Sequence, residues 1–311
     1  MTVTKSRGAT KKLGPISVGS KVVRFKVPNI DRRFTVHEDL ICQTSRFFST
    51  RLQKARKQAC ANDECCVCTE ALNPTTKDLT FCHQCGQNMH ELCLEAWKRT
   101  ATSTPNPRTP RPPPTHQPNC PMCRAPWKND PLLTHLVIDH AFYLDAESLQ
   151  LYLDWLYSAR LCISAQISRK TDAFNLVVLK LWGVATAVQD DAFKAVVVST
   201  FFEEARARFW TESVQWAFVL RRCEDEVREF ILEVSLVYIE PGWFAKEAGV
   251  WPSVFVRQLA DVAMVNWAER KSFGELKKVW LDKLGGVGEE AEVVEEEEEE
   301  EEGEETIQMP T

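Results

Sequence analysis

Four pairs of cysteine and histidine residues, each with two residues between its members, constrain this chain more than any other feature of its sequence. The two-residue spacing lets one tight turn present both side chains to a single tetrahedral ion at about 2.0–2.3 Å. Four pairs supply eight ligands, which is enough to close two structural zinc sites with no open position. The pairs are Cys65 and Cys68, Cys82 and Cys85, His90 and Cys93, and Cys120 and Cys123.

Other cysteines and histidines compete for these roles. Cys60 and Cys66 are alternatives within the first pair, but Cys65 keeps the two-residue spacing and is therefore preferred. His83 and His116 break the pair pattern and rank below the eight. The cysteines outside this stretch lie in apolar helical patterns, which predicts ordinary buried thiols: Cys42, Cys162 and Cys223.

A disulfide framework would need an oxidising compartment. The N-terminus is basic but lacks the apolar core of a secretory signal. No apolar run reaches the roughly eighteen residues that a membrane-spanning helix needs. We therefore expect an intracellular protein, cytoplasmic or nuclear, with reduced thiols and no membrane partner.

The stretch 60–127 is dense in Cys, His and Pro and lacks the hydrophobic periodicity of a helix or a strand. It resembles the RING finger family on the strings CCVC (65–68), FCHQCGQNMHELCLEAW (81–97) and CPMCRAPW (120–127). The resemblance implies that the first and third pairs hold one ion and the second and fourth pairs hold the other, which spacing alone does not show. The second pair is Cys-x2-Cys rather than the commoner Cys-x-His and looks like a variant with a CGxNxH string. A long Pro-rich segment (98–119) is a second departure.

RING fingers usually act as ubiquitin ligases by holding a ubiquitin-conjugating enzyme, and four non-ligand residues match that surface. The resemblance assigns enzyme contacts to an aliphatic residue before the second ligand, a Trp after the third pair and a Pro inside the last pair: Val67, Trp97 and Pro121. It assigns to the cation after the last pair, Arg124, the restraint of thioester-linked ubiquitin in a reactive pose, with no nucleophile from the finger itself. The alternative is that the three apolar residues only fill the finger's small core.

Both flanks of the finger resemble the BTB (POZ) family in a fungal-looking form. The matching text is VGSKVVRFKV…RRFTVHEDLICQTSRFFSTRLQ before the finger and LVIDHAFYLDAESLQLYLDWLYSARL after it. The finger therefore looks like an insertion between the first long helix of that domain and its next strand. The resemblance implies a BTB homodimer or a cullin scaffold as partner, and a structural hydrogen-bonding role for His37.

Hydrophobic periodicity outside the finger predicts strands first and helices afterwards. KVVRFKV and RRFTVH alternate around a Pro-Asn-Ile-Asp turn, which predicts a β-hairpin, and one apolar face predicts a helix over 38–57. An aspartate stands at or near the start of each of two later helical patterns, 171–189 and 190–209, as a favoured cap. The pattern further predicts a strand at 134–139, a helix over 146–157, and helical structure up to Leu284.

The net charge of −6 is unevenly distributed. Residues 289–305 hold thirteen glutamates and no basic residue, so the rest of the chain carries a net charge of +7. A run of this kind cannot bury a core and is typical of a solvated tail or one that binds basic partners. Lys98, Arg108 and Arg111 lack interleaved aromatic residues and do not indicate nucleic-acid binding.

The expected fold class is α+β: a BTB/POZ-like domain interrupted by a two-zinc cross-brace RING finger, followed by an all-α region and an acidic tail. The predicted parts are a disordered N-terminus (1–20), a first BTB-like part (21–59), the finger (60–127), a second BTB-like part (128–200), a helical C-terminal region (201–286) and a disordered acidic tail (287–311).

Two functional hypotheses follow from these patterns. The leading one is a RING-type ubiquitin ligase that binds two structural zinc ions and a ubiquitin-conjugating enzyme, while the BTB-like scaffold dimerises or selects a protein substrate that the sequence does not identify. The alternative is a non-enzymatic adaptor in which zinc only stabilises an interaction surface. A finger docked on the scaffold with Trp97 buried would favour the adaptor.

Overall fold

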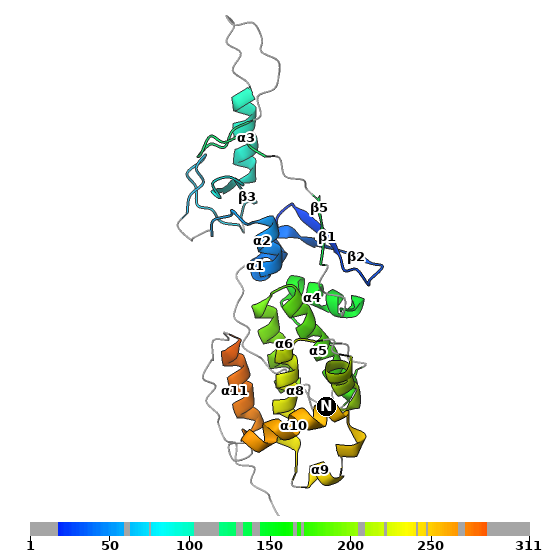
Figure 1. The fold of residues 1–311 in the computed structure, drawn as a ribbon. Helices are drawn as coiled ribbons and strands as arrows, with labels where there is room; N and C mark the ends of the chain where they lie inside the picture. Colours follow the sequence, from blue (N-terminus) through cyan, green and yellow to red (C-terminus); the bar gives the residue numbers. More distant parts are fainter. Residues whose placement is uncertain are drawn as a thin grey trace, which may run out of the picture.

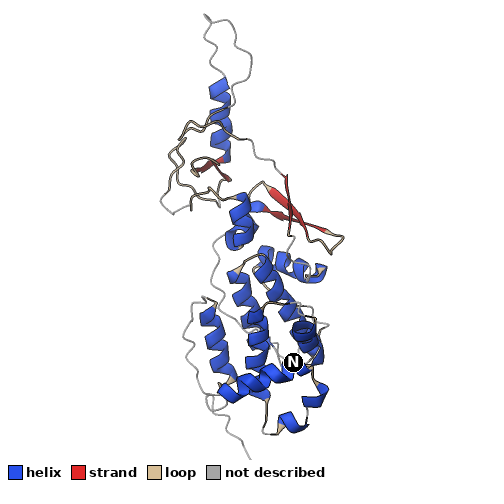
Figure 2. Ribbon diagram, in the orientation of Figure 1, coloured by secondary structure: helices blue, strands red, loops and turns tan. Residues whose placement is uncertain are grey.

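The computed structural model describes residues 18–58, 63–74, 76–102, 118–128, 133–138, 144–163, 167–168, 171–204, 209–220, 223–240, 242–246, 248–266 and 271–284. Figure 1 shows a small finger at one end of the molecule, a sheet beside it and a group of helices at the other end. Helices dominate that second end in Figure 2. The predictions for residues 1–17 and for the glutamate run lie outside the described residues.

A three-stranded sheet in the order β2-β1-β5 joins residues from both sides of the finger. β1 (Val22–Lys26) pairs antiparallel with β2 (Arg33–His37), which confirms the predicted hairpin. β5 (Leu133–Val137) pairs parallel to the other side of β1, where the sequence predicted a strand. Successive side chains of a strand point to opposite faces, so the buried Val23 and Phe25 of β1 place one face of the sheet against the core.

Two short helices follow the hairpin in place of the single helix predicted there, so that prediction was wrong. They are α1 (Glu38–Thr44) and α2 (Arg46–Leu52), and Ser45 between them has an extended backbone. Its hydroxyl accepts a hydrogen bond from the Phe48 N–H at 3.3 Å and donates one to the Val188 carbonyl at 2.5 Å. Ser45 thus caps α2 and fixes it to the helical part of the molecule.

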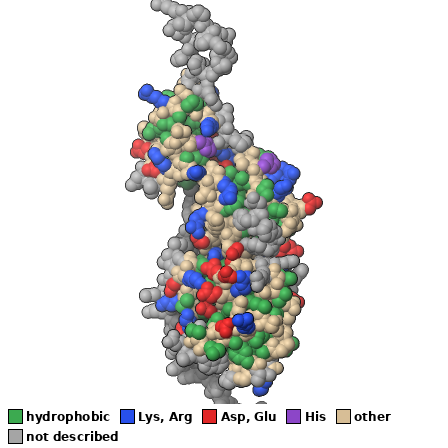
Figure 3. All heavy atoms as spheres, in the orientation of Figure 1, with side chains coloured by type: hydrophobic (Ala, Val, Ile, Leu, Met, Phe, Trp, Pro, Cys, Tyr) green, Lys and Arg blue, Asp and Glu red, His purple; other side chains and the backbone are tan. Residues whose placement is uncertain are grey.

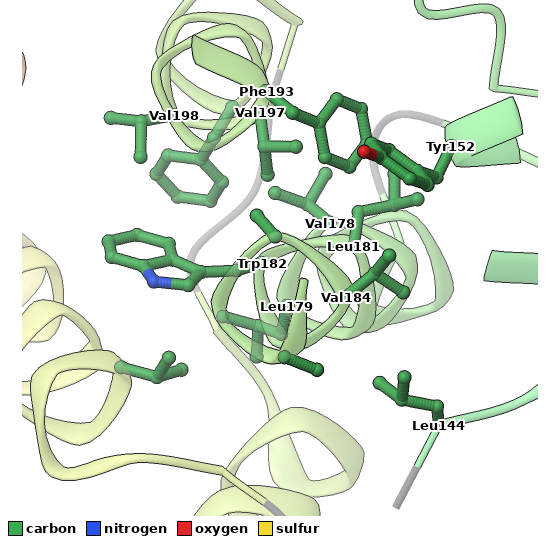
Figure 4. Close-up of a cluster of buried hydrophobic side chains, with 14 of the residues drawn as sticks. Leu144, Tyr152, Val178, Leu179, Leu181, Trp182, Val184, Phe193, Val197 and Val198 are labelled. Carbon is green, nitrogen blue, oxygen red and sulfur yellow. The ribbon is translucent and has the colours of Figure 1, made fainter. Parts of the chain in front are cut away.

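The central helix of the remaining part is α5 (Asp172–Ala187), which lies against α4, α6 and α7. Trp182 and Leu179 of α5 are fully buried, and Figure 4 shows them among apolar side chains of the surrounding elements. The other elements of this part are α4 (Ala146–Ser158), α6 (Asp191–Glu204), α7 (Thr211–Val214), the π-helix η1 (Gln215–Val219), α8 (Asp225–Tyr238), α9 (Trp243–Lys246), the 3-10 turn η2 (Ala248–Val250), α10 (Ser253–Asn266) and α11 (Phe273–Lys283).

One continuous cluster of buried side chains extends from Val23 in β1 to Trp280 in α11. The ring of Trp182 packs against those of Phe230 and Trp280, with centroids 5.0 and 5.5 Å away. Aromatic rings at such separations contribute beyond their buried area. The predicted boundary between residues 200 and 201 falls inside this cluster, and the division into a BTB-like part and a helical region stays a prediction.

Asp190 joins three elements at the start of α6. Its carboxylate accepts hydrogen bonds from the Phe193 N–H at 2.9 Å, the Tyr152 hydroxyl at 2.9 Å and the Thr44 hydroxyl at 2.5 Å. Burial raises the pKa of this carboxyl, and the three donors offset the cost of its desolvation. Asp190 is therefore the cap expected for α6, whereas Asp172 at the start of α5 instead accepts hydrogen bonds from residues at the start of α7.

The predicted α+β class is confirmed as a mostly helical fold with a small sheet and two cysteine-rich groups. His37 has the structural role expected of it, since its Nδ1 lies 2.8 Å from the Tyr157 hydroxyl oxygen. Every helix in the part of the chain that the structure describes falls short of what crossing a membrane requires in length and apolar character. Assignment to the BTB family stays a prediction.

Candidate metal centres

The finger contains regular structure that its sequence did not reveal by periodicity. A short hairpin of β3 (Leu79–Phe81) and β4 (Asn88–His90) leads directly into α3 (Glu91–Thr102). β4 ends on the ligand candidate His90, and Cys93 lies in the first turn of α3. The strand-to-helix junction therefore positions the third pair, where the other three pairs use turns.

The three Cys-x2-Cys pairs have one common backbone geometry. In the first, the Cys65 N–H donates to the Glu70 carbonyl and the Thr69 N–H donates back to the Cys65 carbonyl, both at 2.8 Å. The residue after the second cysteine is left-handed each time, with φ values of 59° at Thr69, 75° at Gly86 and 61° at Arg124. The matching bonds are Cys82 N–H to Gln87 O (3.1 Å), Gly86 N–H to Cys82 O (2.7 Å), Cys120 N–H to Ala125 O (2.8 Å) and Arg124 N–H to Cys120 O (3.0 Å). Each turn is thus shaped to aim both thiols at one point.

The eight ligand candidates come together in two groups of four. In each group the potential ligand atoms all lie within 4.8 Å of one another. The groups are Cys65, Cys68, His90 and Cys93, and Cys82, Cys85, Cys120 and Cys123. This is the interleaved arrangement that the RING resemblance implies, with pairs one and three in one group and pairs two and four in the other.

Distances within the groups fit a tetrahedral zinc ion. Zinc–sulfur bonds of about 2.3 Å and zinc–nitrogen bonds of about 2.0 Å separate neighbouring sulfurs by about 3.8 Å, and sulfur from nitrogen by about 3.6 Å. In the second group Sγ of Cys82 lies 3.8 Å from Sγ of Cys123, and Cys85 Sγ lies 4.0 Å from Cys120 Sγ. In the first group, Sγ of Cys68 lies 3.3 Å and Sγ of Cys93 lies 3.7 Å from Nδ1 of His90.

His90 also has the outer partner that a metal-binding imidazole needs. Its Nδ1 faces the sulfurs, while its Nε2 lies 3.3 Å from the Ala71 carbonyl oxygen. A proton on Nε2 donated to that carbonyl leaves the Nδ1 lone pair for a cation. The imidazole is almost completely buried, so this orientation is held by packing as well.

Individual thiols in the two groups differ in their proton affinity. Burial raises the pKa of Cys93 and of Cys120 to about 12, while the Ala125 N–H lowers the pKa of Cys123. Because cysteine binds a metal as the thiolate, metal binding must release the protons of these thiols. The free energy of metal binding then contributes to the folding of the finger.

The competing residues lie outside both groups. Cys66 is half-buried between the ligands of the first pair, and the His83 ring lies tilted against that of Phe81, with centroids 4.6 Å apart. Cys60 and His116 are outside the described residues. Of the three cysteines predicted to be buried thiols, Cys42 and Cys223 are half-buried, but Cys162 is exposed. That prediction was wrong for Cys162 because its segment leaves α4 as an irregular stretch instead of continuing an apolar helical face.

The CGxNxH string docks the finger on the segment that precedes it, a role that sequence reasoning missed. The Lys57 N–H donates to the Gly86 carbonyl at 3.0 Å. The Asn88 amide donates to the Lys57 carbonyl at 2.8 Å and accepts from Arg56 Nε at 3.0 Å. A Cβ on Gly86 would lie 1.9 Å from the Ala55 carbonyl oxygen, so only glycine allows the two backbones to approach this closely.

Arg56 extends this docking contact to the sheet-bearing part of the chain. Its guanidinium lies 2.6 Å from the Asp39 carboxylate of α1 and 5.3 Å from the centroid of the Phe81 ring in β3. A second contact joins the Ser20 hydroxyl to the Glu91 carboxylate at the start of α3, at 3.0 Å. The finger is consequently attached to its neighbour by side-chain contacts in addition to the chain itself.

The four residues matched to an enzyme-binding surface differ in exposure. Val67 and Pro121 are half-buried, and Val67 packs on the finger's own core. Trp97 is 38% exposed although its Nε1–H donates to the Asn119 carbonyl at 2.9 Å. The Arg124 side chain is exposed, and no hydrogen bond or ion pair joins it to another of the described residues.

Two exposed apolar residues of the finger were not singled out from the sequence. Leu92 is 74% exposed and Met122 is 54% exposed. Leu92 lies in α3 between His90 and Cys93, and Met122 lies in the turn between Cys120 and Cys123. The sequence feature that could have indicated them is a large apolar residue between the two ligands of a pair.

Comparison of the chain with protein-family models, with curated proteins and with solved structures finds no match in any of the three.

Proposed function

We propose that each cysteine-rich group binds one zinc ion and that the finger recruits a ubiquitin-conjugating enzyme, so that the protein acts as a RING-type ubiquitin ligase. The observation that carries the proposal is Trp97, an indole fixed by a hydrogen bond yet left 38% exposed. Aromatic residues that are held rigid and exposed are typical anchors of protein interfaces.

Zinc has a structural role in this proposal. Four protein ligands complete a tetrahedral zinc ion, and thiolate with imidazole is the donor set that zinc prefers. Bound in this way, zinc would hold the turns of the finger together in a part of the chain whose own apolar cluster is small. The residues that act on a partner are then the ones between and beside the ligands.

The interaction surface would combine Trp97 of α3 with the apolar residues Leu92 and Met122, and with Val67 and Pro121 beside them in the ligand turns. The alternative in which Val67, Trp97 and Pro121 only fill the core is disfavoured for Trp97, because its side chain is exposed, and Leu92 and Met122 are exposed as well. Several large apolar residues exposed on so small a module favour an interface over a core role.

Arg124 would supply the ubiquitin-restraining contact. Its backbone belongs to the fourth pair's turn, which fixes the point from which the guanidinium extends. A planar guanidinium donates several hydrogen bonds at once and can bridge two partners. The finger would then accelerate transfer by holding the thioester in a reactive geometry, with the conjugating enzyme providing the cysteine.

The finger would be an insertion in a BTB-like scaffold. The pairing of β1 with β5 supports this, since one sheet is completed by strands on either side of the finger. On this proposal a BTB homodimer or a cullin scaffold binds the body, and the body presents the finger to a protein substrate.

The test is autoubiquitination by the full chain with a panel of charged conjugating enzymes. We expect Val67→Ala and Arg124→Ala each to lower the rate about tenfold, the loss of about 1.4 kcal/mol at an interface anchor. Matched controls are Val279→Ala, an exposed valine of α11, and Lys128→Ala, an exposed cation near the fourth pair. No activity across the panel from a folded chain with two zinc ions would leave the adaptor hypothesis instead. Activity that survives Arg124→Ala would refute the restraint assigned to that residue.

A further inference from the structure

A basic face covers the side of the sheet that points away from the core. Strand alternation directs Arg24 and Lys26 of β1, Arg33 of β2 and His135 of β5 to this face. They border a shallow cavity of about 230 Å³. In Figure 3 blue and purple side chains gather beside one another at the part of the surface where Figure 1 draws the sheet. We call these four residues the basic face.

Two like charges on this face are Lys26 and its cross-strand partner Arg33, while the imidazole of His135 lies opposite Arg24. Like charges at opposite positions of a sheet destabilise it. A bound anion would convert this repulsion into attraction, whereas the bare sheet carries the cost.

Counter-charges are missing from the basic face, although many cations of the helical part are paired. Among the described residues, Lys26, Arg33 and His135 make no ion pair, and Arg24 only donates to the neutral Thr35 hydroxyl at 3.3 Å. The strands and turn from 22 to 37 contain one acidic residue, Asp31, against four basic ones. By contrast, cations on the helices of the body meet carboxylates: Arg46, Lys180, Lys194, Arg228, Lys277 and Lys283.

The chain itself carries a matching polyanion. Residues 289–305 hold thirteen glutamates without a basic residue. The described structure ends at Leu284, and the 21 residues from 285 to 305 can extend over about 70 Å. A folded body of this size has a radius of gyration of about 18 Å, so the run can reach any side of it.

We propose that the glutamate run 289–305 binds the basic face of its own chain. Carboxylates would enter the cavity between Lys26, Arg33 and His135 and form charge-assisted hydrogen bonds with them. The tail would then cover the face against other acidic ligands, which must displace it to bind. Because the run is tethered, its effective concentration at the face is high even where each contact is weak.

The test measures binding of a fluorescent peptide with the sequence of residues 287–311 to the full chain by anisotropy. The reference variant keeps the whole chain but has all thirteen glutamates of 289–305 changed to glutamine, which frees the basic face. We expect this variant to bind the peptide at least tenfold more tightly than the wild-type chain, whose own tail competes. Raising the salt concentration should weaken binding in proportion to the ions released.

Two triple variants in the glutamine-tail background locate the contact. Arg24→Gln, Lys26→Gln and Arg33→Gln together should lower peptide affinity at least tenfold. The matched control removes the same charge from three exposed lysines elsewhere, Lys54→Gln, Lys246→Gln and Lys278→Gln, and should change affinity less than threefold. Equal losses of peptide affinity in the two triple variants would mean non-specific attraction and would overturn the proposal. A wild-type chain that binds the peptide as tightly as the glutamine-tail variant would overturn it too.

A measurement on the unaltered protein guards against misfolding of the variants. A carbodiimide joins carboxylates to lysine amines that are already in contact, so the wild-type chain at low salt should form a cross-link between Lys26 and a tail glutamate within one chain. Cross-links from the tail to Lys54, Lys246 or Lys278 in place of Lys26 would overturn the assignment of the basic face.

Discussion

Replacing Gly86 by alanine should detach the finger from the preceding segment while leaving its metal groups intact. The added Cβ meets the Ala55 carbonyl oxygen at 1.9 Å, where real Cβ contacts stay beyond 3.0 Å, so the two backbones must separate by about an ångström or more. That movement breaks the hydrogen bond from the Lys57 N–H to the Gly86 carbonyl and strains the one from Asn88 to the Lys57 carbonyl.

The expected cost to docking comes from the two hydrogen bonds that cross this interface. The left-handed φ of 75° at Gly86 belongs to the finger's own turn and is the same whether or not the finger is docked, so its cost does not enter. Each lost hydrogen bond costs about 1 kcal/mol, which gives roughly 2 kcal/mol of docking free energy for Gly86→Ala. Hydrogen exchange at the Lys57 amide should therefore speed up by about thirtyfold, because a tenfold change corresponds to about 1.4 kcal/mol.

Variants at the equivalent positions of the other turns separate docking from turn geometry. Thr69 and Arg124 have the same left-handed backbone and already carry a Cβ, so Thr69→Ala and Arg124→Ala should leave Lys57 exchange unchanged. Gly86→Asn tolerates the left-handed backbone better than alanine but keeps the clash, and should behave like Gly86→Ala. Exchange at Lys57 that stays within threefold of wild type in Gly86→Ala, with two zinc ions still bound, would refute this account of the interface.

Three further outcomes follow from the packing and the charges. Chelation of zinc should abolish amide protection over 63–128 while α5 and α8 keep theirs, because the buried residues of the finger form a cluster of their own; loss of protection throughout would contradict this. Burial alone would raise the pKa of Asp145, but the Ser148 N–H and Lys180 lower it below its ordinary value, so its stabilising effect is present above the unfolded pKa and lost as pH falls through the folded one. Asp145→Asn should thus lower the urea midpoint at pH 7, and its difference from wild type should shrink as the pH falls through the folded pKa; a difference that does not shrink on acidification would exclude the charge as its cause. Trp182→Ala should cost about 3–5 kcal/mol in urea unfolding, since the side chain is fully buried, whereas the half-exposed Val254→Ala should cost less than about 0.5 kcal/mol.

The metal groups were the most predictable part of this chain because their signal is local. Two-residue spacing fixes each turn by itself, and the structure repeats one backbone geometry at Cys65, Cys82 and Cys120. The interleaving of the pairs depends on contacts between distant residues and came from the family resemblance. The exposure of Leu92 and Met122 was missed because a search for ligands treats the residues between them as spacers.

Errors in the fold came from interactions that periodicity does not register. The break at Ser45 interrupts a continuous apolar face, and the residue that stabilises it, Val188, lies far along the chain. The exposed Cys162 follows an amphipathic helix whose pattern gave no sign that the next turn is irregular. Gly86 belongs to the CGxNxH string, but its close approach to the Ala55 carbonyl depends on the three-dimensional structure and cannot be seen in the sequence.

The contacts around the finger bear on how a recruited enzyme would act. The chain enters the finger after α2 and leaves it into β5, and Arg56, Lys57 and Ser20 hold it from the side. Two covalent connections with additional hydrogen bonds leave the finger less rotational freedom than a single linker would. If the conjugating enzyme binds at Trp97 as proposed, its thioester has a fixed direction relative to the body, and only substrate lysines presented from that side are within reach. A docking variant such as Gly86→Ala should then broaden the set of modified lysines while retaining the enzyme-binding surface.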